Sequence, residues 1–229
     1  MKKTDIGKSI IDFFMPPKCM FCQNILMSNT PCDCLTSVTA LQLSPYDMKR
    51  KETYKKFQSL DFCISFYLYK GIVRDAILKA KFKNCASFLD GFLQYIPIDL
   101  VAFMAENSID VLVCAPAYKA KFYKREFDLP QEMTKKIAKF AKTEYNFNLI
   151  EKVKATKNQH DLSQMERKTN LNGAFRVKGD VAGKNILIID DILTTGHTLD
   201  ALAKQLKAAN AAKVIGMTFA YNEYEESRK

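Results

Sequence analysis

The stretch of chain from Asn185 to Ala209 restricts the possible folds more than any other. It opens with the apolar run NILIID, continues as DILTTGHT, and ends in a segment rich in alanine and leucine. A short apolar run of this kind is typical of a buried strand, and the segment after the loop is typical of a helix. The sequence therefore predicts a strand over 185–190, a tight loop, and a helix over 198–209.

The same alternation of apolar strands and helices extends over most of the chain. Further strands are predicted at 61–69, 111–115, 174–177 and 213–220. Further helices are predicted at 72–83, 87–107 (interrupted by Pro97) and 129–142. Strands that alternate with helices are typical of an α/β fold with a parallel sheet, and a hydrophobic content of 48% is enough for a sizeable core.

Polar side chains gather where the 185–190 strand ends. Asp190 and Asp191 are adjacent, and hydroxyl groups and a glycine follow them in the loop. Ligands of open α/β sheets bind at the carboxyl ends of the strands, where a glycine and a helix N-terminus favour a phosphate. Two carboxylates suit the paired hydroxyls of a ribose. The alternative is an ordinary strand–turn–helix unit with acidic residues near a helix N-terminus, where they are favoured anyway.

All thirteen positions of Ile186–Thr198 resemble the signature with which type I phosphoribosyltransferases bind phosphoribosyl pyrophosphate (PRPP). The resemblance implies a parallel-sheet type I phosphoribosyltransferase fold and PRPP bound together with Mg²⁺. The PRPP-binding residues that it implies are Asp190, Asp191, Thr194, Thr195, Gly196, His197 and Thr198. In an enzyme, Asp190 and Asp191 would also be the catalytic residues.

Four of the seven cysteines fall within sixteen positions, namely Cys19, Cys22, Cys32 and Cys34. Four thiolates at such spacing predict a structural zinc site, although C-x-C is a less usual second pair than C-x-x-C. The alternative is a reduced and unstructured cysteine-rich tail. Cys63, Cys85 and Cys114 stand in apolar surroundings and are expected to be small core residues.

Further motifs in the same order resemble the ComF family, which is associated with DNA uptake in natural competence. They are FFMPPKCMFC, a Y-x-G-x-x-R-x-x-I-x-x-x-K-F pattern from Tyr69 to Phe82, an apolar strand closing on Pro116, Arg125–Asp128, Gln159–Asn170, and Gly173–Phe175. The resemblance implies a zinc-binding module at 1–40 and a phosphoribosyltransferase-like domain at 60–229. Gln23 stands where a glycine commonly follows the first cysteine pair, and Glu126 and Asp128 replace the usual glycine and asparagine.

A basic and aromatic segment, 119–127, follows the 111–115 strand. Lys119 and Arg125 are expected to bind pyrophosphate there, together with Arg167 from a polar stretch that resembles the mobile hood of these enzymes. Interleaved cations and rings also suit single-stranded DNA, for which Lys121, Phe122, Tyr123 and Lys124 are the candidates. The net charge of +10 favours a polyanionic partner, and the alternative is a solvated basic turn.

The expected function is that of a competence protein which binds PRPP and assists uptake of single-stranded DNA, in contact with uptake machinery at the inner membrane. A metabolic phosphoribosyltransferase that releases pyrophosphate, or a PRPP-sensing regulator, remains the alternative. The N-terminal apolar run Ile10–Met15 is short and is interrupted by Asp12, which predicts an amphipathic helix rather than a signal peptide. A cytoplasmic protein, free or peripheral at the inner membrane, is therefore expected. Residues 41–58 are expected to form a basic linker.

Overall fold

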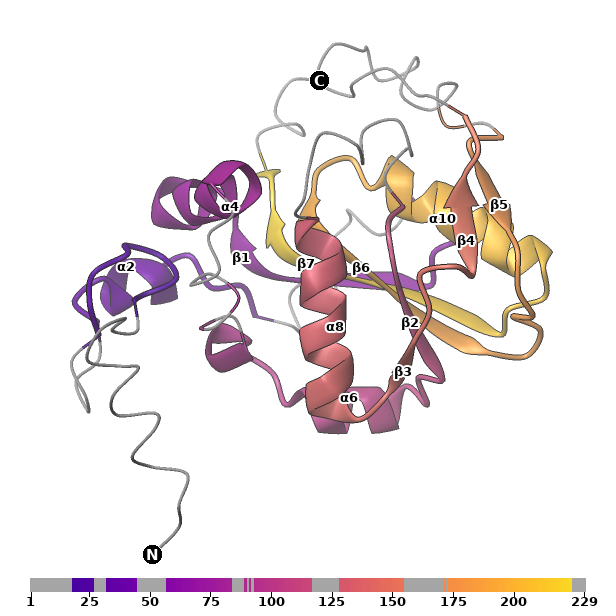
Figure 1. Ribbon diagram of the computed structural model, residues 1–229, viewed down its shortest axis with the longest axis horizontal. Coiled ribbons are helices and arrows are strands. Elements are labelled where there is room, and N and C mark those ends of the chain that lie inside the picture. Colours follow the sequence, from indigo (N-terminus) through magenta and orange to yellow (C-terminus); the bar gives the residue numbers. More distant parts are fainter. Residues whose placement is uncertain are drawn as a thin grey trace, which may run out of the picture.

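A five-stranded parallel sheet forms the centre of the protein (Figure 1). The computed structural model describes residues 18–26, 32–44, 57–83, 89, 91, 93–116, 128–154, 171 and 173–223. The strand order is β1-β7-β6-β2-β3, and each neighbouring pair is parallel. The strands are β1 (Phe62–Leu68), β2 (Val111–Cys114), β3 (Glu144–Tyr145), β6 (Asn185–Leu193) and β7 (Lys213–Tyr221). The predicted parallel-sheet α/β fold is confirmed.

Helices cover both faces of this sheet (Figure 1). One face packs against α4 (Gly71–Lys83), α6 (Leu100–Glu106) and α8 (Leu129–Ala141). The other packs against α10 (His197–Ala208) and a small antiparallel sheet of β4 (Ile150–Lys152) and β5 (Phe175–Val177). The alternation of side chains along β6 shows the division, because Leu187 and Ile189 belong to the first core and Ile186 and Ile188 to the second.

Two predicted elements have different bounds in the structure. β6 runs on to Leu193, because Ile192 and Leu193 still pair with β7, so the two aspartates lie within the strand and not at its end. The predicted 87–107 helix is wrong as a single element. Its described part consists of the short 3₁₀ helix η2 (Leu93–Tyr95) and of α6, with Pro97 between them.

Residues 41–43, predicted as linker, lie along the outer edge of β1. The Leu43 N–H donates to the Phe66 carbonyl at 2.8 Å, and the Leu68 N–H donates to the Leu41 carbonyl at 2.7 Å. They follow the short helix α2 (Leu35–Thr39). Leu41 and Leu43 also pack against the two cores, but two apolar residues within an otherwise polar stretch are too few to show a strand pattern. Residues 45–56 of the predicted linker and the predicted helix at 1–17 lie outside the described residues.

Within the described part of the chain, no helix has the length and apolar character needed to cross a membrane.

Candidate functional site

The loop between β6 and α10 has the geometry of an anion site. Gly196 adopts a left-handed conformation with φ 73° and forms the N-cap of α10. A side chain at this position would also overlap the Phe57 ring, so only glycine fits. Thr194, Thr195 and Thr198 are half-buried around this turn, next to the first N–H groups of the helix. His197 is half-buried at the first position of α10.

The two aspartates lie just before this loop, and each has a partner within the protein. Asp190 Oδ1 accepts a hydrogen bond from the Asp191 N–H at 2.8 Å. Asp191 Oδ2 lies 2.8 Å from Lys81 Nζ on α4, and both side chains are largely buried, with exposed fractions of 12% and 26%. The sequence predicted no role for Lys81, although it is the lysine of the Y-x-G-x-x-R-x-x-I-x-x-x-K-F motif.

Burial and the neighbouring charge of Asp191 raise the pKa of Asp190 to about 7. The Asp191 N–H and the Lys81 ammonium oppose this shift but do not cancel it, and Asp128 adds to it. A carboxyl with this pKa is half-protonated near neutral pH. Asp190 is therefore less repulsive to a phosphorylated ligand than a fully ionised carboxylate would be.

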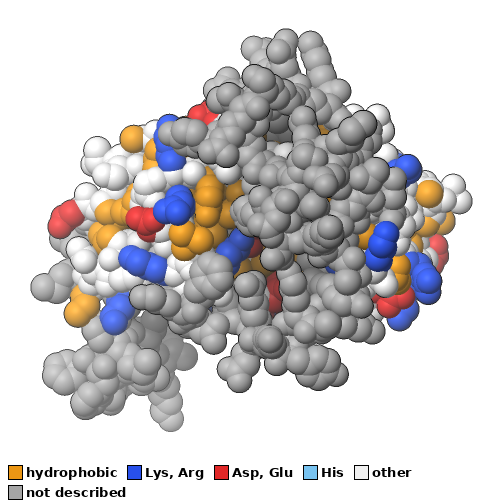
Figure 2. Space-filling view, turned by 90° about the horizontal axis from the view of Figure 1, so that it is seen from above, with side chains coloured by type: hydrophobic (Ala, Val, Ile, Leu, Met, Phe, Trp, Pro, Cys, Tyr) orange, Lys and Arg blue, Asp and Glu red, His pale blue; other side chains and the backbone are white. Residues whose placement is uncertain are grey.

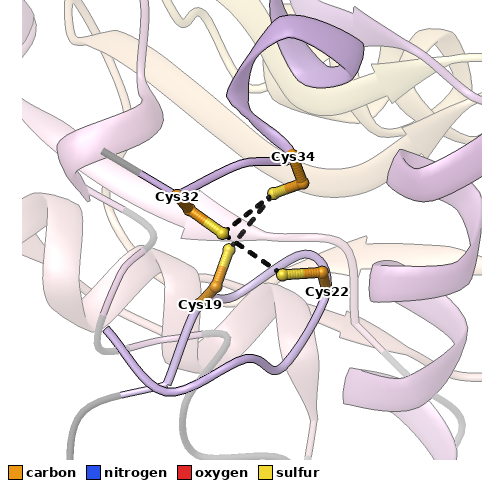
Figure 3. Close-up of side chains that lie close together, drawn as sticks. All are labelled: Cys19, Cys22, Cys32 and Cys34. Atoms are coloured by element: carbon orange, nitrogen blue, oxygen red, sulfur yellow. Dashed lines mark hydrogen bonds between the residues drawn. The ribbon is translucent and has the colours of Figure 1, made fainter. Parts of the chain in front are cut away.

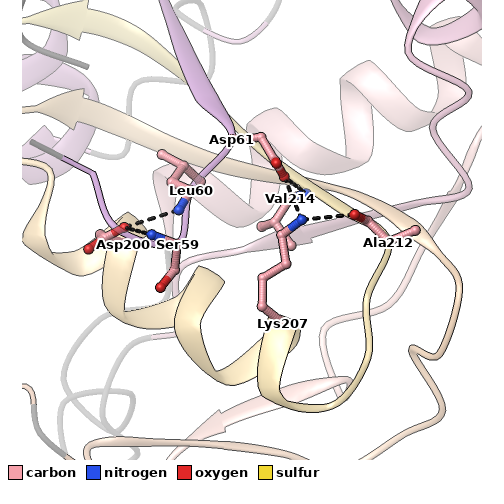
Figure 4. Close-up of polar contacts among 7 residues, drawn as sticks. All are labelled: Ser59, Leu60, Asp61, Asp200, Lys207, Ala212 and Val214. Atoms are coloured by element: carbon pink, nitrogen blue, oxygen red, sulfur yellow. Dashed lines mark hydrogen bonds and ion pairs between the residues drawn. The ribbon is translucent and has the colours of Figure 1, made fainter. Parts of the chain in front are cut away.

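Two carboxylates, Asp200 and Asp61, attach the chain before β1 to helix α10, which follows the loop (Figure 4). Asp200 Oδ1, in the first turn of α10, accepts hydrogen bonds from the N–H groups of Gln58, Ser59 and Leu60 at 3.0, 2.8 and 3.0 Å. At the other end of the helix, Lys207 Nζ lies 2.8 Å from Asp61 Oδ2. Asp61 Oδ2 also accepts from the Val214 N–H of β7.

A second candidate site is the cluster of Cys19, Cys22, Cys32 and Cys34 (Figure 3). Their sulfur atoms lie within 4.8 Å of one another, and the closest pairs are 3.3 to 3.5 Å apart. Four thiolates around a tetrahedral zinc ion, each ~2.3 Å from the metal, would stand roughly 3.8 Å apart. The four predicted ligands are thus brought together in an arrangement that could hold a metal ion.

Gln23 adopts a left-handed backbone conformation, which favours glycine. Its φ is 70°, and its side-chain amide donates to the carbonyls of Cys19 and Met20 at 3.0 and 3.2 Å. These bonds offset the strain of a left-handed non-glycine residue. Phe21, in the same turn, is fully buried and lies against Tyr67 of β1 and Phe219 of β7. The cysteine-rich turn is therefore packed onto the central sheet.

Several predicted site residues lie outside the described residues. They are Lys119, Lys121, Phe122, Tyr123, Lys124, Arg125 and Arg167, and also Cys85. Asp128, at the end of that segment, caps α8 by accepting from the Gln131 N–H at 3.1 Å. Aspartate and asparagine are equivalent N-caps, which explains the replacement at this position. Cys63 and Cys114 are buried, as predicted.

The described basic residues form no single patch on the face seen from above (Figure 2). Lysine and arginine side chains are distributed among acidic and hydrophobic ones over that face. The overall surplus of positive charge is therefore not concentrated, on this face, in the part of the chain that the structure describes.

Comparison with known proteins gives a family match over the second half of the chain and relatives that match somewhat less than half of it. The model of the phosphoribosyl transferase domain matches residues 105–229. DNA utilization protein YhgH of Escherichia coli (strain K12) is 30% identical over 105 residues, 46% of each chain. Competence protein F of Haemophilus influenzae is 23% identical over 108 residues, 46% of this chain and 47% of that one. The matches thus span about half the length of these relatives, whose names agree with the predicted ComF resemblance.

Among solved structures, the adenine phosphoribosyltransferase of Saccharomyces cerevisiae is similar to 65% of this chain, over 76% of its own. The TM-score is 0.37 and the sequence identity 16%.

Proposed function

Because the chain belongs to the phosphoribosyl transferase domain family, and its relatives support a ComF-type protein, we propose that it binds PRPP at the carboxyl end of β6. The observation that carries this proposal is the juxtaposition of the acidic pair with the loop of Gly196. The acidic pair suits the ribose hydroxyls, and the loop suits a phosphate. Both belong to one strand–loop–helix unit.

In this proposal the 5-phosphate of PRPP lies against the α10 N-terminus, with hydroxyl donors from Thr194, Thr195 and Thr198. His197 flanks the phosphate at the first helical position. Asp190 and Asp191 accept hydrogen bonds from the ribose hydroxyls, and Mg²⁺ accompanies the pyrophosphate. Lys119, Arg125 and Arg167 are proposed to bind that pyrophosphate.

We further propose that the four clustered cysteines bind one Zn²⁺. The sulfur separations suit a tetrahedral ion, and an all-thiolate ligand set is typical of structural zinc. When bound, the ion would cross-link the turn around Cys19 to the start of α2 near Cys34. The expected result of elemental analysis, on protein purified without chelator, is about one zinc per chain. A value near zero would contradict the proposal.

The proposed cellular role is the handling of single-stranded DNA during uptake in natural transformation. It is supported by the names of the relatives, by the net charge of +10, and by the basic and aromatic composition of 119–127. If about five phosphates are neutralised, the logarithm of affinity should fall with log salt with a slope near −3.5. Absence of binding to a single-stranded oligonucleotide at low salt would remove the DNA part of the proposal and leave the PRPP part untouched.

The decisive experiment for PRPP is a calorimetric titration of the wild type and of the Asp190→Ala, Asp191→Ala double variant. Each lost hydrogen bond to a carboxylate costs about 1.5–3 kcal/mol, so affinity should fall about a hundredfold or more. Asp180→Ala is a matched control, since Asp180 accepts one backbone hydrogen bond on an exposed turn. Wild-type affinity in the double variant would refute the assignment. Pyrophosphate release, measured on the same protein, tells turnover from binding alone.

A further inference from the structure

The Y-x-G-x-x-R-x-x-I-x-x-x-K-F motif places its lysine against the acidic pair. At its start, the Tyr69 N–H donates to the Tyr221 carbonyl at 2.7 Å and holds the end of β1 to β7. Gly71 then begins α4 with φ 50°, a left-handed conformation that suits glycine. The motif thus sets the direction in which α4 leaves the sheet, and the direction determines where Lys81 arrives.

Lys81 stands at the margin of the buried stripe of α4. Val73, Ile77 and Ala80 are fully buried, and Lys81 follows Ile77 by four positions, on the same side of the helix. Its aliphatic stem can therefore lie along the core while the ammonium reaches Asp191 Oδ2 at 2.8 Å. The pair joins residues 110 positions apart in the sequence.

Each carboxylate of the acidic pair uses one of its two oxygens in a contact within the protein. Asp190 Oδ1 accepts a hydrogen bond from the Asp191 N–H, and Asp191 Oδ2 forms an ion pair with Lys81 Nζ. Among the contacts made by the described residues, this leaves one oxygen of each carboxylate for a ligand. One such oxygen on each of two consecutive residues could serve two adjacent hydroxyl groups, as on C2 and C3 of a ribose.

We propose that Lys81 is a positioning residue which holds the Asp191 carboxylate in the correct rotation, and through it sets the preference for a ribosyl over a 2-deoxyribosyl ligand. The inference rests on the proposed function, because it assigns Asp190 and Asp191 to the ribose hydroxyls. The contact with the Lys81 ammonium at 2.8 Å restricts the rotation of the Asp191 carboxylate. Without Lys81, the Asp191 side chain would rotate more freely. Its charge would lie beside Asp190 without a neighbouring positive charge from Lys81.

Two other roles would produce different binding data. If Lys81 only fastened α4 to β6, its loss would weaken all ligands of the site by the same factor. If it contacted pyrophosphate directly, its loss would weaken PRPP and leave ribose 5-phosphate, which has no pyrophosphate, unaffected.

The test is calorimetric titration of Lys81→Met with PRPP, ribose 5-phosphate and 2-deoxyribose 5-phosphate. We expect the affinity for PRPP and ribose 5-phosphate to fall together, about ten- to hundredfold, with a much smaller change for the deoxy ligand. The ratio of ribose to deoxyribose affinity should thus approach one. Lys81→Arg should restore most of the preference. Lys79→Met, the same substitution on the same helix, should change none of the three affinities.

A double-variant cycle checks that Lys81 acts through Asp191. Adding Lys81→Met to Asp191→Asn should weaken ribose 5-phosphate by less than about twofold beyond Asp191→Asn alone. Equal weakening of all three ligands, or loss confined to PRPP, would overturn the inference. If Lys81→Met does not fold by circular dichroism, Lys81→Gln enters the same comparison. A wild-type protein that binds neither ribosyl ligand, or has no preference between the two sugars, would instead overturn the proposed function.

Discussion

Asp190→Asn is expected to stabilise the folded protein while it weakens the binding of PRPP. Burial and the charge of Asp191 raise the pKa of Asp190 from its ordinary value of 3.8 to about 7. The folded state therefore holds the protonated carboxyl more readily than the unfolded chain does. Asparagine resembles that neutral form and keeps an oxygen that can accept from the Asp191 N–H.

The sign and size of the effect follow from linkage between protonation and folding. A carboxyl with a raised pKa makes the folded protein lose stability as the pH rises from about 4 to about 7. Over that window the loss amounts to about 4 kcal/mol at most, and relaxation around Asp191, Lys81 and Asp128 will reduce it. We expect Asp190→Asn to gain about 2–4 kcal/mol over the wild type near pH 8, and little near pH 4.

Urea denaturation followed by circular dichroism, at several pH values, measures this difference directly. The chain contains no tryptophan, so backbone dichroism is a better signal than intrinsic indole fluorescence. Asp180→Asn, on an exposed turn, should leave the pH dependence unchanged. The reasoning would be refuted if Asp190→Asn differed from the wild type by the same amount at pH 4 and pH 8, or if it were less stable at both.

Three further predictions concern the supports of the two sites. Asp200→Ala removes the acceptor for three backbone N–H groups and should lower the free energy of unfolding by about 2–4 kcal/mol in urea, with a smaller loss for Asp200→Asn. Gly196→Ala should cost about 1–3 kcal/mol by the same assay, and the addition of Phe57→Ala should relieve the overlap but not the cost of the positive φ. Cys22→Ser should lower the zinc content and the melting temperature, and Cys63→Ser, outside the cluster, should leave the zinc content unchanged.

Strong local patterns were enough to predict the main elements of the fold. The apolar runs of β2, β6 and β7 are buried on both faces, so nearly every residue carries the signal. The short strands β3 and β4 have two and three residues, too few to show a period. The far end of β6 was missed because two carboxylates interrupt its apolar run, whereas pairing with β7 continues past them.

The site was predictable where its residues are neighbours in the sequence. The loop of Thr194–Thr198 and the four cysteines are such groups, and the structure brings the described members of each together. Lys81 was not recognised because its partner lies far away along the chain, although the motif around it was visible. The brace of Asp200 on residues 58–60 was missed for a similar reason, since backbone N–H groups leave no trace in a sequence.

The strand order has a consequence for the way the protein is made. β1 is held in the sheet by β7, and the hydrogen bond between Ser65 and Thr218 joins residues 153 positions apart. Synthesis proceeds from the N-terminus, so β1 and the turn of Phe21 leave the ribosome long before β7 is made. Until then β1 has no strand β7 to pair with, and Phe21 cannot pack against Phe219. If the four cysteines bind zinc as proposed, their closeness in sequence would allow them to do so during that interval. The metal-bound turn would then pack onto the sheet as a preformed unit. The apolar strand β1 would stay unpaired until β7 is synthesised, and a chaperone could protect it until then.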